Sequence, residues 1–293
     1  MTDDDAVRAS ARGVGAVKMS ARLSAVSPEL SWSFEPSVLL GVLILATLYV
    51  TAWRRARTPR ERHPPSSGRL VLFATGLLVV LLALVSPIDQ LGSQLLVIHM
   101  LQHILLLDVA PILMIVGLTK VLLRPATARL RSIEEHAGFL GHPVFAVLAY
   151  AGLMWLWHIP TLYDAALRGS AVHALEHLCF AAAGTLYWWH LLSPIRSRVR
   201  LRGLGPIAYM VSTRLLVGIL GIALTFAPRT FYPFYQHHPH YWGLSPTEDQ
   251  SLAGLVMALE QSIVMGIALV ILFVQMLGES EREAQRAERF EVI

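Results

Sequence analysis

The sequence has little cysteine and little charge. Of its 293 residues one is cysteine, Cys179, and only 15% are Asp, Glu, Lys or Arg, whereas 55% are hydrophobic. A single cysteine excludes an intrachain disulfide framework and any Cys-x-x-Cys metal or redox motif. A soluble domain carries roughly 25% charged residues. The composition therefore excludes an ordinary soluble domain and predicts an all-α, polytopic integral membrane protein.

Long apolar runs are abundant instead, and a helix needs about 20 such residues to cross the hydrocarbon core. Short connections between the runs favour one compact seven-transmembrane helix bundle over residues 36–278. We expect a flexible tail at 1–35, which lacks the apolar core of a cleavable signal, and a second tail at 279–293. The seven predicted spans are about Ser37–Trp53, Leu70–Val85, Ser93–Gly117, Pro143–Trp157, Ala171–Leu192, Gly205–Ala227 and Ser251–Leu277.

Basic residues are confined to alternate loops. The segments after the first, third, fifth and seventh spans each hold three or more Lys or Arg, whereas the opposite loops hold only Arg168 and Arg229. Lys and Arg accumulate in cytoplasmic loops. We therefore expect the N-terminus outside and the C-terminus in the cytoplasm. Because the arginines flank apolar spans rather than form a basic patch, the sequence argues against nucleic-acid binding.

Five histidines fall in the outer halves of three predicted spans. His99 and His103 are four apart in the third span, His173 and His177 are four apart in the fifth, and His158 ends the fourth. Residues four apart share one helix face. Counting rise along the helices, His103 and His177 lie about 15 and 9 Å below the outer membrane face. We therefore expect imidazoles from three helices to meet at one depth, where polar groups are costly and commonly functional.

Such a cluster suits a metal ion. Neutral imidazole is the commonest protein metal ligand and binds copper, zinc, iron and nickel. Nearby Met100, Met154 and Met257 add thioethers, which favour Cu(I) over harder ions. The sequence predicts a copper site for one ion or a close pair.

Three other interpretations remain open. His173-Ala-Leu-Glu176-His177 has the H-x-x-E-H spacing of a zinc metalloprotease, with zinc in place of copper. Two imidazoles could bind a haem that carries electrons, although the histidines lie near one membrane level without a second tier. The pairs could also be hydrogen-bonded structural residues.

One buried ion pair is also predicted. Arg214 lies within the sixth span and needs an anion, because an unpaired buried charge is strongly destabilising. Rise from the outer helix ends puts Arg214 at about 17 Å, Glu260 at about 14 Å and Asp108 at about 23 Å. We therefore predict a structural ion pair between Arg214 and Glu260.

Several short motifs follow one another on these spans: HMLQH from His99, WHIP from Trp157, HALEH from His173, the pair Trp188-Trp189, and DQSLAGLVM from Asp249. Together they resemble the CtaG family of cytochrome c oxidase assembly factors, over about Trp32 to Leu277. The resemblance implies a non-enzymatic protein of the bacterial plasma (inner) membrane. Its implied role is to handle copper and deliver it to the catalytic copper site of a haem–copper oxidase.

The same resemblance implies partners and site residues. The oxidase catalytic subunit is the expected partner, with another copper chaperone as a further candidate and membrane lipids around both. The residues that match the family motifs become candidate metal-handling residues; they are His99, His103, His158, His173 and His177, with Met257 and Asp249 beside them.

Overall fold

The computed structural model of the chain describes residues 26–58, 61, 63–195, 199, 201 and 203–291. Most of the predicted N-terminal tail and four of the predicted cytoplasmic arginines after the fifth span lie outside these residues. Within them the only β pairing is an isolated bridge between Val26 and Tyr241, so the all-helical prediction is confirmed. The helices are α2 (Pro36–Ala56), α3 (Ser67–Val85), α4 (Pro87–Gly92), α5 (Leu96–Ile104), η1 (Leu105–Val109), α6 (Ala110–Gly117), α7 (Lys120–Leu123), η2 (Arg124–Ala126), α8 (Thr127–Ala137), η3 (Gly138–Gly141), α9 (Pro143–Trp157), α10 (Pro160–Arg168), α11 (Ser170–Leu192), α12 (Gly205–Thr225), α13 (Pro233–Gln236) and α14 (Pro246–Glu291).

Five stretches of the described chain are helical, long and apolar enough to cross a membrane: α2, α3, the continuous run Leu96–Gly117, α12 and Pro246–Val274 of α14. A sixth is reached if Lys120–Gly141 and Pro143–Trp157, which are bent by 62°, count as one span. The protein is therefore a multi-pass membrane protein, but these criteria do not reach the predicted seven spans. The shortfall has two causes. Helix α9 has only 15 residues, about 22 Å, and α11 carries polar histidines and a glutamate that lower its hydropathy.

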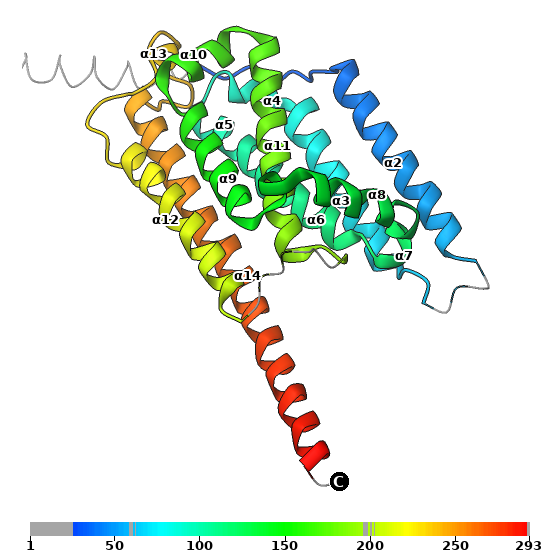
Figure 1. Cartoon of the computed structure of the whole chain (residues 1–293). Helices are drawn as coiled ribbons and strands as arrows, with labels where there is room; N and C mark the ends of the chain where they lie inside the picture. The colour runs from blue at the N-terminus through cyan, green and yellow to red at the C-terminus, as the bar shows by residue number, and fades with distance from the viewer. Residues whose placement is uncertain are drawn as a thin grey trace, which may run out of the picture.

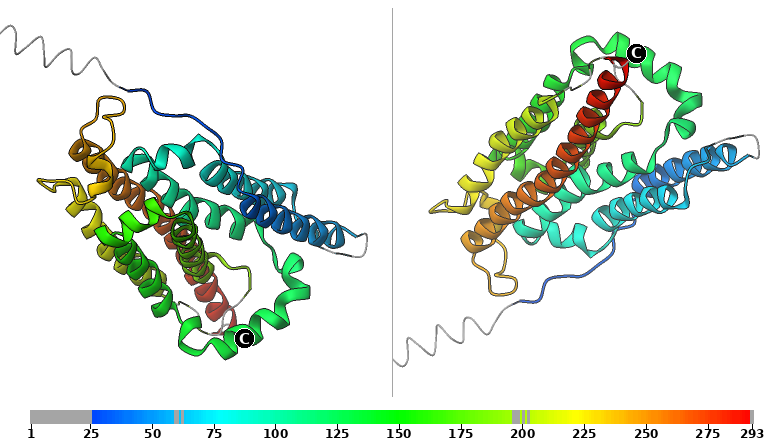
Figure 2. Two further views of the ribbon diagram at one scale, coloured as in Figure 1. Left: turned by 90° about the horizontal axis from the view of Figure 1, so that it is seen from above. Right: turned by 90° about the horizontal axis from the view of Figure 1, so that it is seen from below.

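The helices form one bundle with two edges (Figures 1 and 2). Helices α2 and α3 pack together at one edge, and α12 and α14 at the other, with α5, α6, α9 and α11 between them. The larger apolar core lies among α5, α9, α11, α12 and α14. A smaller one joins α2 to α3. Helix α14 continues well beyond the bundle, to Glu291.

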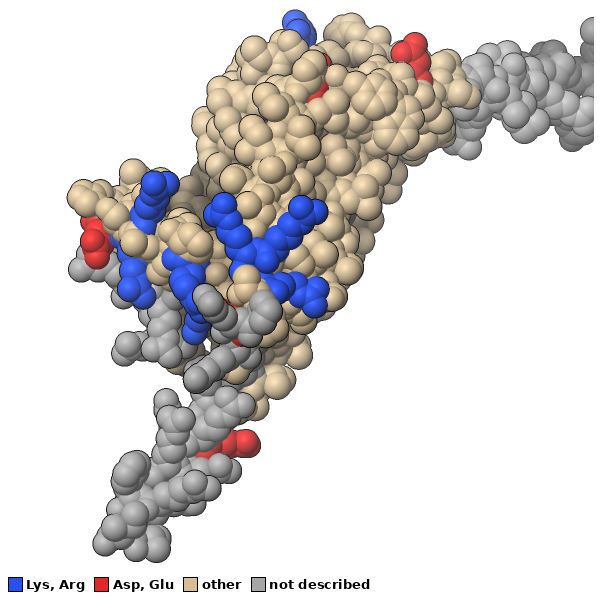
Figure 3. All heavy atoms as spheres, turned by 90° about the vertical axis from the view of Figure 1, so that its right-hand side faces the viewer, with Lys and Arg blue, Asp and Glu red and all other residues tan. Residues whose placement is uncertain are grey.

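The outward faces are apolar, as lipid contact requires. Leu43 and Leu48 on α2 and Ile219 on α12 are 62%, 63% and 58% exposed. Apolar surface of this extent marks a membrane or partner contact. Charge is concentrated elsewhere: in Figure 3 most of the lysine and arginine side chains in view gather in one region toward the lower part of the picture, and one stands apart at the upper edge.

The third predicted span is interrupted by a π-helical turn at η1. Such turns are rare and occur mostly as single bulges within α-helices, frequently at functional sites. Helix α11 packs directly on this turn, because a Cβ at Gly184 would overlap the carbonyl oxygen of Leu107. Small residues permit such close helix approach in membranes. The contact brings α11 and its histidines against the helix that carries His99 and His103.

The start of α5 is held by α14. The two carboxylate oxygens of Asp249 accept hydrogen bonds from the backbone N–H groups of Leu96 at 2.7 Å and Val97 at 3.0 Å. The first N–H groups of a helix lack intrahelical partners and carry partial positive charge, so a carboxylate there is stabilising. Asp249 therefore fixes the position of the helix that presents His99.

Candidate metal centre

The five predicted histidines meet inside the bundle. His99 and His103 come from α5, His173 and His177 from α11, and His158 from the C-terminal end of α9. Their ring centroids lie 4.2 Å apart within each pair on one helix, 5.4 Å between His99 and His173, 5.8 Å between His103 and His177, and 6.5 Å between His103 and His158. Helix period and rise therefore predict this convergence.

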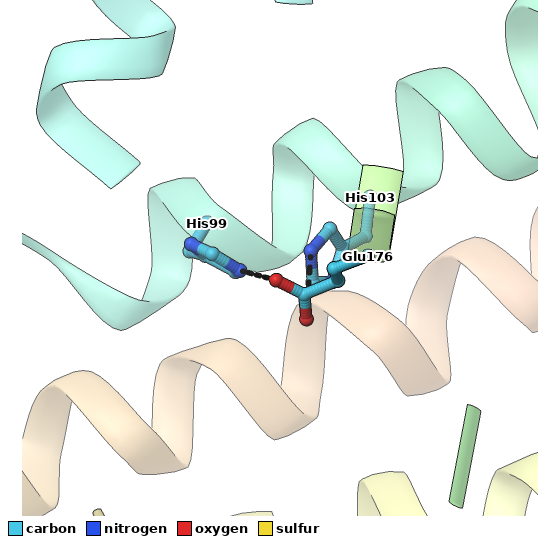
Figure 4. A group of neighbouring side chains, drawn as sticks. All are labelled: His99, His103 and Glu176. Carbon is cyan, nitrogen blue, oxygen red and sulfur yellow. Dashed lines mark ion pairs between the residues drawn. The ribbon is translucent and has the colours of Figure 1, made fainter. Parts of the chain in front are cut away.

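A carboxylate lies at the centre of the cluster (Figure 4). Glu176 of α11 has one oxygen 3.7 Å from Nε2 of His99 and the other 3.6 Å from Nε2 of His103. All three side chains are at most 1% exposed. The sequence identifies Glu176 only as part of the zinc-protease spacing. The structure shows that this α11 residue forms a group with His99 and His103 of α5.

The group lacks the hydrogen bonds that buried polar atoms normally make. Nε2 of His99, both ring nitrogens of His103 and both oxygens of Glu176 have no hydrogen-bond partner among the described residues. The separations of 3.6 and 3.7 Å exceed the 2.7–3.2 Å of an N–H···O hydrogen bond. Buried polar groups nearly always have a hydrogen-bond or metal partner. We therefore expect these atoms to bind something that is not part of the chain.

A metal ion has the right dimensions to be that partner. One donor atom from each of His99, His103 and Glu176 lies within 4.8 Å of the others. A tetrahedral ion with bonds of about 2 Å separates its ligand atoms by roughly 3–4 Å. The three side chains can therefore bind one ion with small adjustments and leave a fourth position for another ligand.

The histidines of α11 form a second layer beside this group. Nε2 of His173 and Nε2 of His177 also make no hydrogen bond to the part of the chain that the structure describes. His177 is 8% exposed, whereas His173 is half-buried. The group of potential metal ligands in the described chain does not include these two nitrogens, so they lie beside it.

Tyrosines contact the cluster at the end of the bundle where α10 and α13 lie. The Tyr163 ring is 5.1 Å from the His99 ring and 4.1 Å from the Tyr232 ring. The Tyr235 hydroxyl donates to the Gly92 carbonyl oxygen at 2.8 Å, and the Tyr232 hydroxyl donates to that of His158 at 3.3 Å. These side chains are at most 4% exposed, so they keep water from the imidazoles.

Two further candidate residues have other positions. Asp249 uses both carboxylate oxygens to hold the start of α5, and it does not belong to the ligand group on His99 and His103. Asp249 therefore affects the centre by positioning α5. Met257 is 2% exposed and packs in the larger apolar core on α14.

The predicted Arg214–Glu260 ion pair is replaced by other contacts. The Arg214 guanidinium donates to the Ser262 hydroxyl at 2.9 Å, and Glu260 accepts from the Gln261 side-chain amide at 3.1 Å. The ion pairs of the described residues do not include the predicted one. Rise estimates depth but not rotation, and Arg214 lies on an exposed face of α12, beside the buried face that contains Thr213.

A further buried carboxylate lies five residues beyond His103. Asp108, on the π-helical turn, accepts from the Tyr150 hydroxyl at 2.8 and 2.9 Å and from Trp188 Nε1 at 2.7 Å. The Tyr150 hydroxyl in turn accepts from the Gln261 amide at 3.1 Å. The sequence indicates a polar Asp108 near Pro111, but not this set of donors.

Fold and site together define an all-helical, multi-pass membrane protein with a buried histidine–carboxylate centre. Residues 47–279 match the cytochrome c oxidase caa3 assembly factor family, Caa3_CtaG. The chain belongs to this family, which confirms the resemblance of its motifs.

Proteins to which the chain is similar are longer than the chain. Uncharacterised proteins of Mycobacterium leprae and Mycobacterium tuberculosis are each 24% identical over 279 residues, which cover 88% of this chain. The chain spans 41% of the length of these relatives. No solved structure matches the chain.

Proposed function

We propose that this protein assists assembly of a haem–copper cytochrome c oxidase by binding copper at His99, His103 and Glu176 and delivering it to the oxidase's catalytic copper site. It acts as a copper carrier rather than an enzyme. Membership of the assembly-factor family supports the target. The copper step rests on the chemistry of the buried centre.

One observation carries the copper step: three buried side chains direct unpartnered metal-ligand atoms toward one another. Imidazole nitrogens bind copper well, and the ligand set around them includes the thioether of Met100, which is 1% exposed. The rings of His158, His173 and His177 each lie within 6.5 Å of the His99 or His103 ring. A hydrogen-bonded structural cluster, by contrast, would satisfy these atoms within the protein.

The position of the centre suits transfer. Moving a bare ion through hydrocarbon costs tens of kcal/mol in the Born limit. A site inside the bundle avoids this if the acceptor takes the ion at a similar depth. Release requires reversible binding, which three ligands with an exchangeable fourth favour over a closed structural site.

The proposed topology has seven spans, with α9 and α11 added to the five that length and composition identify. The basic loops are cytoplasmic, so the N-terminus is outside and the C-terminus inside a bacterial plasma membrane. The histidine centre then lies nearer the outer face. The proposed partners are the oxidase catalytic subunit, a second copper chaperone that supplies the ion, and the surrounding lipids.

Zinc is the alternative cargo, because two histidines and one glutamate also form the ligand set of zinc hydrolases. A zinc protease of the H-x-x-E-H type would bind zinc through His173 and His177 and would keep Glu176 free as the general base. In this structure Glu176 lies between His99 and His103 instead. A haem between His99 and His103 does not fit, because their rings are only 4.2 Å apart.

The test is to replace His99 and His103 with Ala in the host and measure copper content and activity of the oxidase. We expect oxidase that has lost most of its catalytic copper while its haem is retained. His190→Ala is the control, because this histidine lies on the same α11 helix as His177 but thirteen residues, about 20 Å, further along. Normal oxidase in the double variant would refute the proposed function.

A further inference from the structure

A second pair of metal-ligand atoms lies next to the histidine–glutamate group. Nδ1 of His158 is 2.6 Å from the backbone carbonyl oxygen of Met154. A carbonyl oxygen only accepts hydrogen bonds, so Nδ1 carries the proton and Nε2 of the neutral ring presents a lone pair. That lone pair faces the Met100 sulfur at 3.3 Å.

Two acceptors therefore face each other in a buried place. A thioether sulfur has no proton to donate, and His158 and Met100 are 6% and 1% exposed. A charged imidazolium would resolve the conflict only with an anion nearby, and the ion pairs of the described residues do not include His158. A cation that binds both lone pairs would resolve it directly.

The spacing fits such a cation. With bonds of about 2.0 Å to nitrogen and 2.3 Å to sulfur, a tetrahedral ion separates the two atoms by roughly 3.5 Å. His103 can complete the set, because it lies three residues from Met100 on one helix face and its ring centroid is 6.5 Å from that of His158. Both of its ring nitrogens lack hydrogen bonds within the described chain.

We propose that Met100 and His158 form a second, softer copper position, which shares His103 with the His99–His103–Glu176 position and selects Cu(I). This inference rests on the proposed copper function and adds the oxidation state of the copper that is carried. A thioether and an imidazole suit Cu(I), whereas the carboxylate position also accepts harder ions such as Zn²⁺. The ion can then move between the two positions by exchanging one ligand at a time while His103 stays bound.

The test is X-ray absorption spectroscopy of the purified full chain in lipid nanodiscs, loaded with Cu(I) under ascorbate. We expect a copper–sulfur distance of about 2.3 Å in the wild type. Met100→Leu should remove it while nitrogen ligands remain, because Leu conserves volume and the fold. Met210→Leu is the control, since Met210 is equally buried at 1% exposed but lies on α12.

A competition titration against a chromogenic Cu(I) chelator gives the second measurement. We expect Met100→Leu to weaken Cu(I) binding about tenfold or more and to leave Zn²⁺ binding unchanged, with Met210→Leu the same as the wild type for both. Copper bound without sulfur in the wild type would overturn the soft position and leave the proposed function standing. A wild type that takes up no copper at all would overturn both.

Discussion

Two buried carboxylates of this bundle have opposite surroundings. Asp108 accepts hydrogen bonds from Tyr150 and Trp188, and all three side chains are fully buried. Glu176 is also 0% exposed, yet neither of its oxygens has a hydrogen-bond partner in the described chain. Asp108 lies in a candidate membrane span and Glu176 packs against that span, where an unsatisfied polar group is costly.

Under the proposed function the contrast has a simple explanation: the Asp108 network is structural, and the Glu176 group is the proposed metal site. The Asp108 network joins η1, α9 and α11 and holds the helices in register. The Glu176 group leaves buried polar atoms without hydrogen-bond partners among the described residues, which lowers stability unless an ion binds there. Sites that bind or react are commonly less stable than the rest of a fold for this reason. The difference predicts opposite consequences for changes at the two carboxylates.

Asp108→Ala should produce the largest loss of stability. Hydrogen bonds to a charged group contribute about 1.5–3 kcal/mol each, and the change leaves the Tyr150 hydroxyl and Trp188 N–H buried without acceptors. We expect the free energy of unfolding to fall by about 3–5 kcal/mol, measured by detergent-induced unfolding in mixed micelles. An unchanged unfolding curve would show that the network is dispensable.

Glu176→Gln should act in the other direction. The carboxylate makes no hydrogen bond, whereas an amide can donate one to Nε2 of His99 or His103. We expect the metal-free variant to be more stable than the wild type by about 1 kcal/mol, in the same unfolding assay. Copper should stabilise the wild type more than the variant, since a ligand that binds only the folded state raises its stability and the variant lacks one ligand of the His99–His103–Glu176 position. A variant less stable than the metal-free wild type would contradict this reading of Glu176.

Asp249→Ala tests whether Asp249, a candidate metal-handling residue, is a positioning residue instead. Removing a carboxylate that caps a helix start costs about 1 kcal/mol, so we expect a moderate loss of stability and faster amide hydrogen exchange at Leu96 and Val97. Copper should still bind with the same number of nitrogen ligands. Loss of an oxygen ligand from the copper absorption spectrum would instead make Asp249 a ligand.

The smallest effect is expected at Arg214. Its contact with Ser262 is exposed, and such contacts contribute at most about 1 kcal/mol. A double-mutant cycle of Arg214→Gln and Glu260→Gln should give a coupling energy within about 0.5 kcal/mol of zero. A coupling of several kcal/mol would restore the buried ion pair that helix rise predicts.

The sequence predicts the elements of this protein better than it predicts their contacts. The apolar run Pro143–Trp157 coincides with α9, and the i, i+4 spacing correctly brings His99 and His103 to one face. These follow from rise and period, which are properties of a single helix. The partners of Asp249 and Arg214 depend on how neighbouring helices are rotated, which no local pattern contains.

Glu176 illustrates the same limit at the site. Its position between His173 and His177 gives the H-x-x-E-H spacing, which indicates a metal motif within one helix. The structure instead turns its carboxylate toward α5, because Gly184 lets α11 pack directly on the π-helical turn that follows that helix. The ligand group thus combines two helices, and only the tertiary packing identifies it.

The most direct test of the central claim is the amount of copper that the purified chain retains after Cu(I) loading and removal of loosely bound metal in a desalting column. We expect stoichiometric copper in the wild type and in His190→Ala, and almost none in the His99→Ala/His103→Ala double variant, because His103 is shared by both proposed copper positions. Equal copper retention by all three proteins would contradict the proposed function.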